Sequence, residues 1–191
     1  MIFDSCSAAI LSGGQGERMG RQDKGLLLYQ GKPMVSYVAH ALRPCAESLC
    51  INANRNISDY ASLGFKVIED ACEASGKGPL SGLFSCLKSA SSTHLIISPC
   101  DTPLISCQAF EALQQACKNS PEYIHFLSTS SGKHPLHAIL PVDSALKALV
   151  TFFEQSERFS VMAFYDSFSY QPVLWENEEE LLNVNTLEQL Y

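Results

Sequence analysis

The sequence predicts an α/β protein built on a doubly wound, mostly parallel sheet. Short apolar runs alternate with segments of helical periodicity along most of the 191 residues, and strands that alternate with helices typically form parallel sheets covered on both faces. The length is that of one domain, which usually has about 100–200 residues. Neither a linker nor an internal repeat interrupts the chain, so we expect residues 1–191 to fold as a single domain.

The expected elements follow one another without long gaps. Apolar runs predict strands, and apolar residues at three- and four-residue spacing predict helices. Pro33 suits the first turn of its helix, and Ser106 is a typical helix N-cap. The predicted strands are 7–11, 48–52, 65–69, 94–98, 123–128 and 136–140, and the predicted helices are 33–42, 80–90, 106–117 and 144–154. Residues 159–174 are ambiguous, and the tail predicts a short strand around 182–184 followed by a helix.

Charge and hydropathy exclude several classes of protein. Thirteen basic and twenty acidic residues give a net charge of −7, which argues against a nucleic-acid partner. No apolar run reaches the roughly 18 residues of a membrane-spanning helix. The N-terminal segment contains Asp4 and no basic residue, unlike a signal peptide. These features predict a cytoplasmic protein without a membrane partner.

A glycine-rich segment directly follows the first predicted strand. Four glycines fall between Gly13 and Gly20, and Arg18, Arg21 and Lys24 add positive charge to the same stretch. Glycines let backbone N–H groups approach phosphate oxygens closely. The segment therefore predicts a phosphate-binding loop, and the alternative is a flexible surface turn.

Two common phosphate-binding motifs do not fit this segment. A Walker A loop needs a lysine directly after its second glycine, but Leu26 follows Gly25. The dinucleotide fingerprint G-x-G-x-x-G begins at Gly14, but Met19 stands at its third glycine. The sequence therefore supports neither a P-loop NTPase nor a dinucleotide-dependent dehydrogenase.

The same segment resembles the signature of the nucleotidyltransferase superfamily. LSGGQGERMGRQDKGLL is similar to L-(A/S)-(A/G)-G-x-(G/S)-x-R-(F/M)-G, and its LSGG and R-M-G-x-x-DKGL most resemble the molybdenum cofactor guanylyltransferases. Further similar blocks follow in the family's order along nearly the whole chain. They are INANR at 51–55, VIED at 67–70, GPLSG at 78–82, PCDTP at 99–103 and NVNT at 183–186.

The resemblance implies a fold, a reaction and a division of the chain. The fold would be the Rossmann-like nucleotide-diphosphate transferase fold. The reaction would be Mg²⁺-dependent transfer of GMP from GTP to the terminal phosphate of molybdopterin, with release of pyrophosphate. Residues up to about 105 would bind the nucleotide, and the remainder would mainly face the acceptor. Molybdenum-insertion and molybdoenzyme-maturation proteins are implied as possible partners.

Three charged residues would carry the implied catalysis. Lys24 would contact the phosphates as charge moves onto departing pyrophosphate, and the planar fork of Arg18 can hold two phosphate oxygens. Asp101 follows a predicted strand, and a carboxylate at the carboxyl edge of a sheet can bind Mg²⁺. The alternatives are a solvated surface charge for Lys24 and Arg18, and a turn or helix cap for Asp101.

The resemblance also assigns residues to the two substrates. The guanosine portion would be held by backbone groups at the end of the first strand and by two polar side chains that end strands, since Asn and Asp oxygens accept hydrogen bonds from a base or a ribose. These residues are Leu11, Ser12, Gly13, Gly14, Asn52 and Asp70. Asn183 and Asn185 would face the pterin, the alternative being a polar edge strand. Ser12 stands where alanine is commoner in the family.

Two other kinds of function are compatible with these motifs. A molybdopterin cytidylyltransferase or a sugar-phosphate nucleotidyltransferase would differ in nucleotide preference, and such relatives more often carry alanine at the position of Gly13. A non-catalytic nucleotide-binding adaptor would bind GTP without releasing pyrophosphate. The presence of both Lys24 and Asp101 argues against the adaptor.

Overall fold

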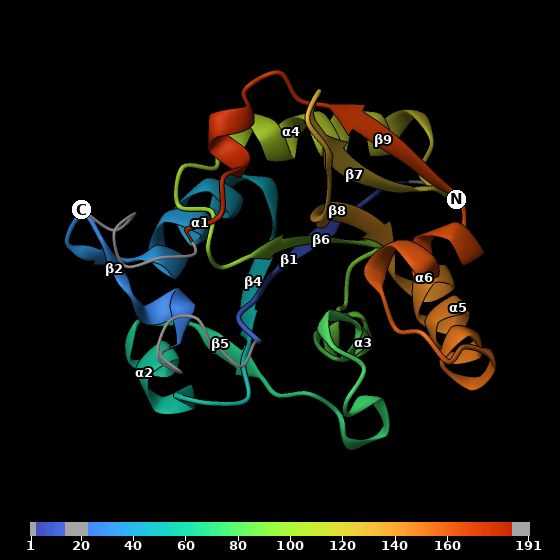
Figure 1. The fold of residues 1–191 in the computed structure, drawn as a ribbon, viewed down its shortest axis with the longest axis horizontal. Coiled ribbons are helices and arrows are strands. Elements are labelled where there is room, and N and C mark those ends of the chain that lie inside the picture. Colours follow the sequence, from blue (N-terminus) through green and yellow to red (C-terminus); the bar gives the residue numbers. More distant parts are fainter. Residues whose placement is uncertain (1–2, 14–22, 185–191) are drawn as a thin grey trace.

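A mixed seven-stranded sheet forms the centre of the protein (Figure 1). This computed structural model describes residues 3–13 and 23–184. The sheet order is β5-β4-β1-β6-β8-β7-β9. Its strands are β1 Cys6–Leu11, β4 Ser48–Asn52, β5 Lys66–Ile68, β6 His94–Pro99, β7 Ile124–Ser128, β8 Lys133–Pro141 and β9 Tyr170–Leu174. Strand β8 pairs antiparallel with β6 and β7, and the other pairings are parallel, so the predicted mostly parallel fold is confirmed.

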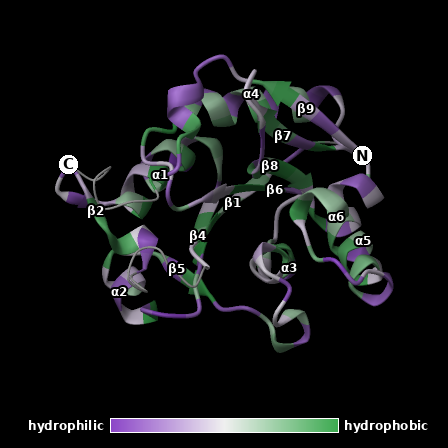
Figure 2. Cartoon of the chain, viewed as in Figure 1, coloured by the Kyte–Doolittle hydropathy of each residue, from purple (hydrophilic) through white to green (hydrophobic). Residues whose placement is uncertain are grey.

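Helices cover both faces of the sheet. Helices α1 Met34–Leu42 and α4 Cys107–Asn119 pack on one face, and α3 Pro79–Ser89, α5 Val142–Gln155 and α6 Val161–Ser167 pack on the other (Figure 1). Side chains of β1 alternate between the two cores, with Ile10 on the α1 side and Ala9 on the α3 side. Figure 2 shows hydrophobic residues concentrated in the central strands and hydrophilic ones in most connecting segments. Strands β1 and β6 are therefore buried along their whole length, as strands covered on both faces must be.

Several short elements escape prediction from the pattern of apolar residues. Strands β2 Leu28–Tyr29 and β3 Lys32–Pro33 form a two-stranded hairpin. Helix α2 Ile57–Ser62 has six residues and follows Asn56, whose φ is 51°. None of these segments spans two full periods of its helix or strand pattern, which is too few for the spacing of apolar residues to reveal it. The ambiguous stretch 159–174 divides into α6 and β9.

The prediction of a strand around 182–184 is wrong. Glu178–Leu181 form a 3₁₀ helix, and the chain continues to Val184 without joining the sheet. The Val184 side chain packs against Met34. Its backbone N–H donates instead to the carbonyl of Asp101, at 2.8 Å. The helix expected after it lies outside the described residues.

The path of the chain through the sheet reverses next to β1. From β1 the chain moves outward through β4 to β5, and β6 then returns to the other side of β1. In such sheets, ligands bind outside the carboxyl ends of the strands at this switch point. Leu11 ends β1 and Pro99 ends β6, so Gly13 and Asp101 follow the two strands that flank the switch point. Among residues 3–13 and 23–184, no helix combines the length and apolar character needed to cross a membrane.

Candidate active site

A cleft of about 950 Å³ opens at the switch point between β1 and β6. Ligand pockets commonly have about 300–1,000 Å³, so the cleft can hold a nucleotide. It is lined by every predicted site residue that the structure describes, namely Leu11, Ser12, Gly13, Lys24, Asn52, Asp70, Asp101 and Asn183. Gly14, Arg18 and Asn185 lie outside the described residues.

Lys24 and Asp101 form an ion pair in this cleft. Lys24 begins the 3₁₀ helix Lys24–Leu26, and Asp101 follows β6. Lys24 Nζ lies 2.9 Å from Asp101 Oδ2, and the two side chains are 28% and 10% exposed. Asp101 Oδ1 is buried and has no hydrogen-bond partner among the described residues. An acceptor left in this state is costly, so Oδ1 is suited to meet a ligand or a cation.

Two residues from the C-terminal half of the chain, His137 and Val184, contact the segment that carries Asp101. Thr102 Oγ1 lies 3.0 Å from His137 Nε2, and both side chains are buried. Burial, with the nearby His134 ring, lowers the pKa of His137 to about 3. The ring is therefore neutral near pH 7 and offers one donor and one acceptor nitrogen. With the contact from Val184 to the Asp101 carbonyl, this holds the chain in place directly after the carboxylate.

Amide and carboxylate groups meet where β4 and β5 end. Asn52 Nδ2 donates to Asp70 Oδ1 at 2.8 Å and to the Ile68 carbonyl at 3.1 Å. Asn54 Nδ2 donates to Asp70 Oδ2, and the Asp70 N–H donates to Asn54 Oδ1, both at 2.8 Å. Asn52 Oδ1 is directed away from these bonds, toward Gly82. It can therefore accept a hydrogen bond from a ligand in the cleft.

Asn54 was missed as a site residue. It lies in the INANR segment at 51–55, but its partner Asp70 is 16 residues away. The signal that could have revealed it is the repetition of Asn at positions 52 and 54, which places both side chains near the same carboxylate. The pairing itself depends on β4 lying beside β5.

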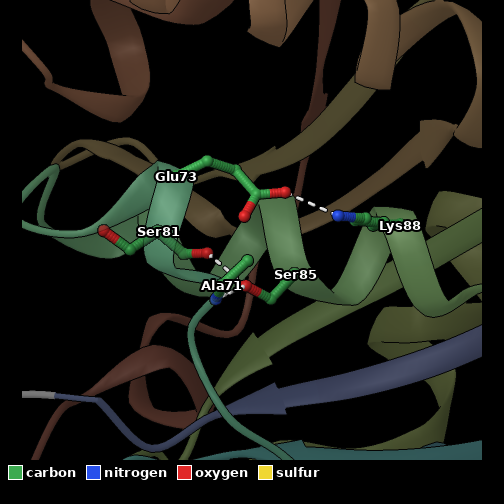
Figure 3. A network of polar contacts seen from close by, with 5 residues as sticks. All are labelled: Ala71, Glu73, Ser81, Ser85 and Lys88. Carbon is green, nitrogen blue, oxygen red and sulfur yellow. Dashed lines mark hydrogen bonds and ion pairs between the residues drawn. The ribbon is translucent and has the colours of Figure 1, made fainter.

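Two serine hydroxyls of helix α3 form hydrogen bonds with the segment that follows Asp70 in the cleft lining (Figure 3). Ser85 Oγ accepts the N–H of Ala71 at 2.8 Å and donates to the Ser81 carbonyl at 2.9 Å. Ser81 Oγ in turn accepts the N–H of Lys77 at 3.1 Å. Because Ala71 directly follows Asp70, the bond from Ala71 to Ser85 holds the backbone next to Asp70 in place.

The thiol in the cleft is not suited to act as a nucleophile. Cys100 is buried, and burial together with the adjacent Asp101 charge raises the pKa of its thiol to about 12. The thiolate is the nucleophilic form of cysteine, so Cys100 remains a neutral packing residue near pH 7. The charged side chains of the described lining are Asp23, Lys24, Arg55, Asp70 and Asp101. The arrangement therefore favours binding and charge neutralisation over covalent catalysis.

Relatives of known name match nearly the whole chain. The family described as "MobA-like NTP transferase domain" matches residues 8–178. The molybdenum cofactor guanylyltransferase of Haemophilus influenzae is 32% identical over 184 residues, which cover 96% of this chain and 95% of that protein. The protein of the same name from Pseudomonas fluorescens is 33% identical over 185 residues, covering 97% and 92%.

Solved structures share the fold at lower identity. Molybdopterin-guanine dinucleotide biosynthesis protein A from Archaeoglobus fulgidus superposes with a TM-score of 0.75 at 18% identity, over 96% of this chain and 94% of that one. The 2-C-methyl-D-erythritol 4-phosphate cytidylyltransferase from Thermus thermophilus gives 0.71 at 12% identity, over 98% and 96%. The fold is thus that of nucleotidyltransferases, and the match over residues 8–178 together with the 32–33% identity to full-length relatives shows that this chain belongs to the MobA-like NTP transferase family.

Proposed function

We propose that this chain transfers GMP from GTP to the terminal phosphate of molybdopterin, forming molybdopterin guanine dinucleotide and pyrophosphate. The names of its full-length relatives support this reaction. The observation that carries it is the placement of Lys24 beside Asp101, at the switch point where a parallel sheet binds nucleotides. A cation for the phosphates and a carboxylate for a metal therefore stand together.

Asp101 would hold Mg²⁺. Its buried Oδ1 is an oxygen acceptor with no partner among the described residues, and Mg²⁺ prefers oxygen ligands. In the described part of the chain, no group of three or more His, Cys, Asp or Glu side chains is arranged to hold a metal. This suits an ion that takes one or two carboxylates from the protein and its other ligands from phosphates and waters. When bound, Mg²⁺ would neutralise charge on the triphosphate.

The side chains of the cleft would act by position and charge. The attacking phosphate of molybdopterin is already anionic, so no general base or covalent nucleophile is required from the protein. Lys24 would bind phosphate oxygens and stabilise the charge that moves onto pyrophosphate, and Arg18 would hold further phosphate oxygens. Orientation of the two phosphates would supply much of the remaining rate.

Guanosine would occupy the region around Asn52 and Asp70. Asn52 Oδ1 and the Asp70 carboxylate can accept hydrogen bonds from a base or a ribose. The Ser12 N–H is already used, because it donates to the Asn52 carbonyl at 2.9 Å. Backbone contacts with guanine would therefore come from the carbonyls of Leu11 and Ser12 and from Gly13.

Replacing Gly82 with alanine should weaken GTP binding about tenfold, by loss of a hydrogen bond at the Asn52 amide. A Cβ at Gly82 would lie 2.1 Å from Asn52 Oδ1, so the amide must move away from the position in which it would bind guanosine. Isothermal titration with GTP measures the effect, and thermal unfolding checks the fold. Gly132→Ala is the matched control because a Cβ there meets nothing within 4 Å. Equal GTP affinity in the Gly82 and Gly132 variants would contradict the assignment of Asn52.

The acceptor would bind at the side of the cleft formed by the C-terminal half. Leu136 and Asn183 come from this half and line the cleft together with Asp101. Asn183, with Asn185, would contact molybdopterin. Molybdenum-insertion and molybdoenzyme-maturation proteins would supply and receive the pterin.

Incubation with GTP, Mg²⁺ and molybdopterin should release pyrophosphate, and omission of any one of the three should prevent it. Replacing GTP by CTP or UTP is the matched control for the nucleotide. Pyrophosphate is converted to phosphate by inorganic pyrophosphatase, and the phosphate is measured. Equal release from CTP would identify a cytidylyltransferase instead. Binding of GTP without pyrophosphate release would identify a nucleotide-binding adaptor.

A further inference from the structure

A tyrosine outside the predicted site links two walls of the cleft. Tyr60 belongs to α2 and is fully buried in the core on the α1 side of the sheet. Its hydroxyl lies 2.5 Å from Asp23 Oδ1 and 2.8 Å from Ser12 Oγ. Ser12 follows β1, and Asp23 directly precedes Lys24. One phenol therefore joins the end of the central strand to the segment that carries the lysine.

The protons of this cluster can be assigned from its chemistry. The phenol has a single proton, and an ionised carboxylate can only accept one. Tyr60 therefore donates to Asp23, and the Ser12 hydroxyl donates its own proton to Tyr60. Burial, with the bond to Asp23, raises the pKa of Tyr60, so the phenol keeps its proton throughout the physiological range. The bond to Asp23 joins a neutral donor to a charged acceptor, which makes it stronger than a bond between neutral groups.

The backbone around Lys24 is packed directly against this cluster. Asp23 Oδ1 also accepts the N–H of Gly25, at 3.2 Å, and so caps the 3₁₀ helix that Lys24 begins. A Cβ at Gly25 would lie 2.5 Å from Tyr60 Oη and 2.6 Å from Ser12 Oγ. The two hydroxyls thus fill the space that a side chain at Gly25 would need. The position of Lys24 is therefore set by both of its neighbours in the chain, because Asp23 bonds to Tyr60 and Gly25 packs against Tyr60 and Ser12.

We propose that Tyr60 is a positioning residue: through Asp23 and Ser12 its hydroxyl sets where Lys24 meets the nucleotide phosphates. The contribution of the hydroxyl can be separated from that of the ring. The ring fills the core, and Tyr60→Phe keeps it; the hydroxyl alone contacts Asp23 and Ser12. This inference rests on the proposed function in one respect: it takes the nucleotide phosphates as the ligand of Lys24.

Ligands with and without phosphates provide the test. Tyr60→Phe should weaken GTP binding about tenfold, the loss expected for one hydrogen bond to a charged group. It should leave guanosine binding within about twofold of the wild-type value, because guanosine has no phosphate for Lys24 to hold. In a Lys24→Ala background, Tyr60→Phe should cause little further loss for GTP, since the two residues would act through one contact. Isothermal titration with both ligands measures all three effects.

Tyr165→Phe is the matched control. Tyr165 is also fully buried, and its hydroxyl donates one hydrogen bond, to the Pro135 carbonyl at 2.9 Å, on the other side of the sheet. This variant should bind GTP and guanosine like the wild type. If Tyr60→Phe does not fold, Asp23→Asn keeps the shape of the side chain, weakens the same bond and should give the same contrast between ligands.

Three outcomes would overturn the inference alone: equal losses for GTP and guanosine, no loss for either, or full additivity with Lys24→Ala. Each would show that the hydroxyl supports the fold in general or contributes nothing at the phosphates. Failure of the wild-type protein to bind GTP would overturn the proposed function and this inference with it. The two failures are therefore distinguished by the wild-type titration.

Discussion

Asp101→Ala should reduce Mg²⁺-dependent guanylyl transfer to the background rate while the protein stays folded. Asp101 is the carboxylate at the end of β6 that pairs with Lys24 and keeps its Oδ1 without a partner in the described structure. Removal of the side chain would take away the proposed oxygen ligand for Mg²⁺ and removes one end of the ion pair. Pyrophosphate release in single-turnover conditions, over a range of Mg²⁺ concentrations, measures the effect.

Two further variants separate the charge of Asp101 from its shape. Asp101→Asn keeps the shape and loses the charge, so it should be nearly as inactive as Asp101→Ala. Asp166→Ala is the control for removal of an acidic residue, because Asp166 is exposed on α6, and it should be fully active. Thermal unfolding should show a folded protein in all three. Wild-type turnover in Asp101→Ala would remove the metal assignment.

Lys24→Ala should lower turnover about 10²–10³-fold, the cost of losing one preorganised charge contact to a transition state. Lys24 Nζ is already held in the cleft, beside Asp101, where the charge of departing pyrophosphate would develop. The substitution also leaves Asp101 without its counter-charge. Because Lys24 is itself 28% exposed, water can take its place at Asp101 Oδ2, and we expect the free energy of unfolding to fall by about 1–3 kcal/mol.

Comparison with a distant lysine isolates this effect. Lys147 is exposed on α5, and Lys147→Ala should keep wild-type turnover and a wild-type unfolding midpoint. Lys24→Arg keeps the charge but not the compact ammonium, so it should recover only part of the rate. A large fall in the unfolding midpoint of Lys24→Ala, enough to account for the lost activity, would refute a role at the phosphates.

The position of Asp101 could be predicted because local sequence is sufficient to place it. An apolar run predicts the buried strand β6, and the carboxylate follows directly at the strand's end. Asn52 and Asp70 were placed by the same reasoning, and the structure brings both into one cleft with Asp101. These three residues share a cleft because their strands lie close together in the sheet. The alternation of strands and helices strongly restricts the strand orders that are possible.

Tyr60 could not be predicted as part of the site. It is one aromatic residue in a helix of six, and its hydroxyl contacts lie 37 and 48 residues away in the sequence. No spacing rule connects such positions. The prediction of a strand in the tail failed for a related reason. Val184 has the β-branched character of a strand residue, but its backbone N–H donates to the Asp101 carbonyl and its side chain packs against Met34.

With Lys24 at the phosphates and Asp101 at the metal, as proposed, nucleotide entry would replace the counter-ion of each of these two side chains. A triphosphate without a bound metal would bind the Lys24 ammonium and leave the Asp101 carboxylate without a counter-charge. A triphosphate that arrives already chelated brings a replacement cation for that carboxylate, so both charges stay compensated. The cleft would therefore discriminate in favour of the chelated form before any chemistry begins.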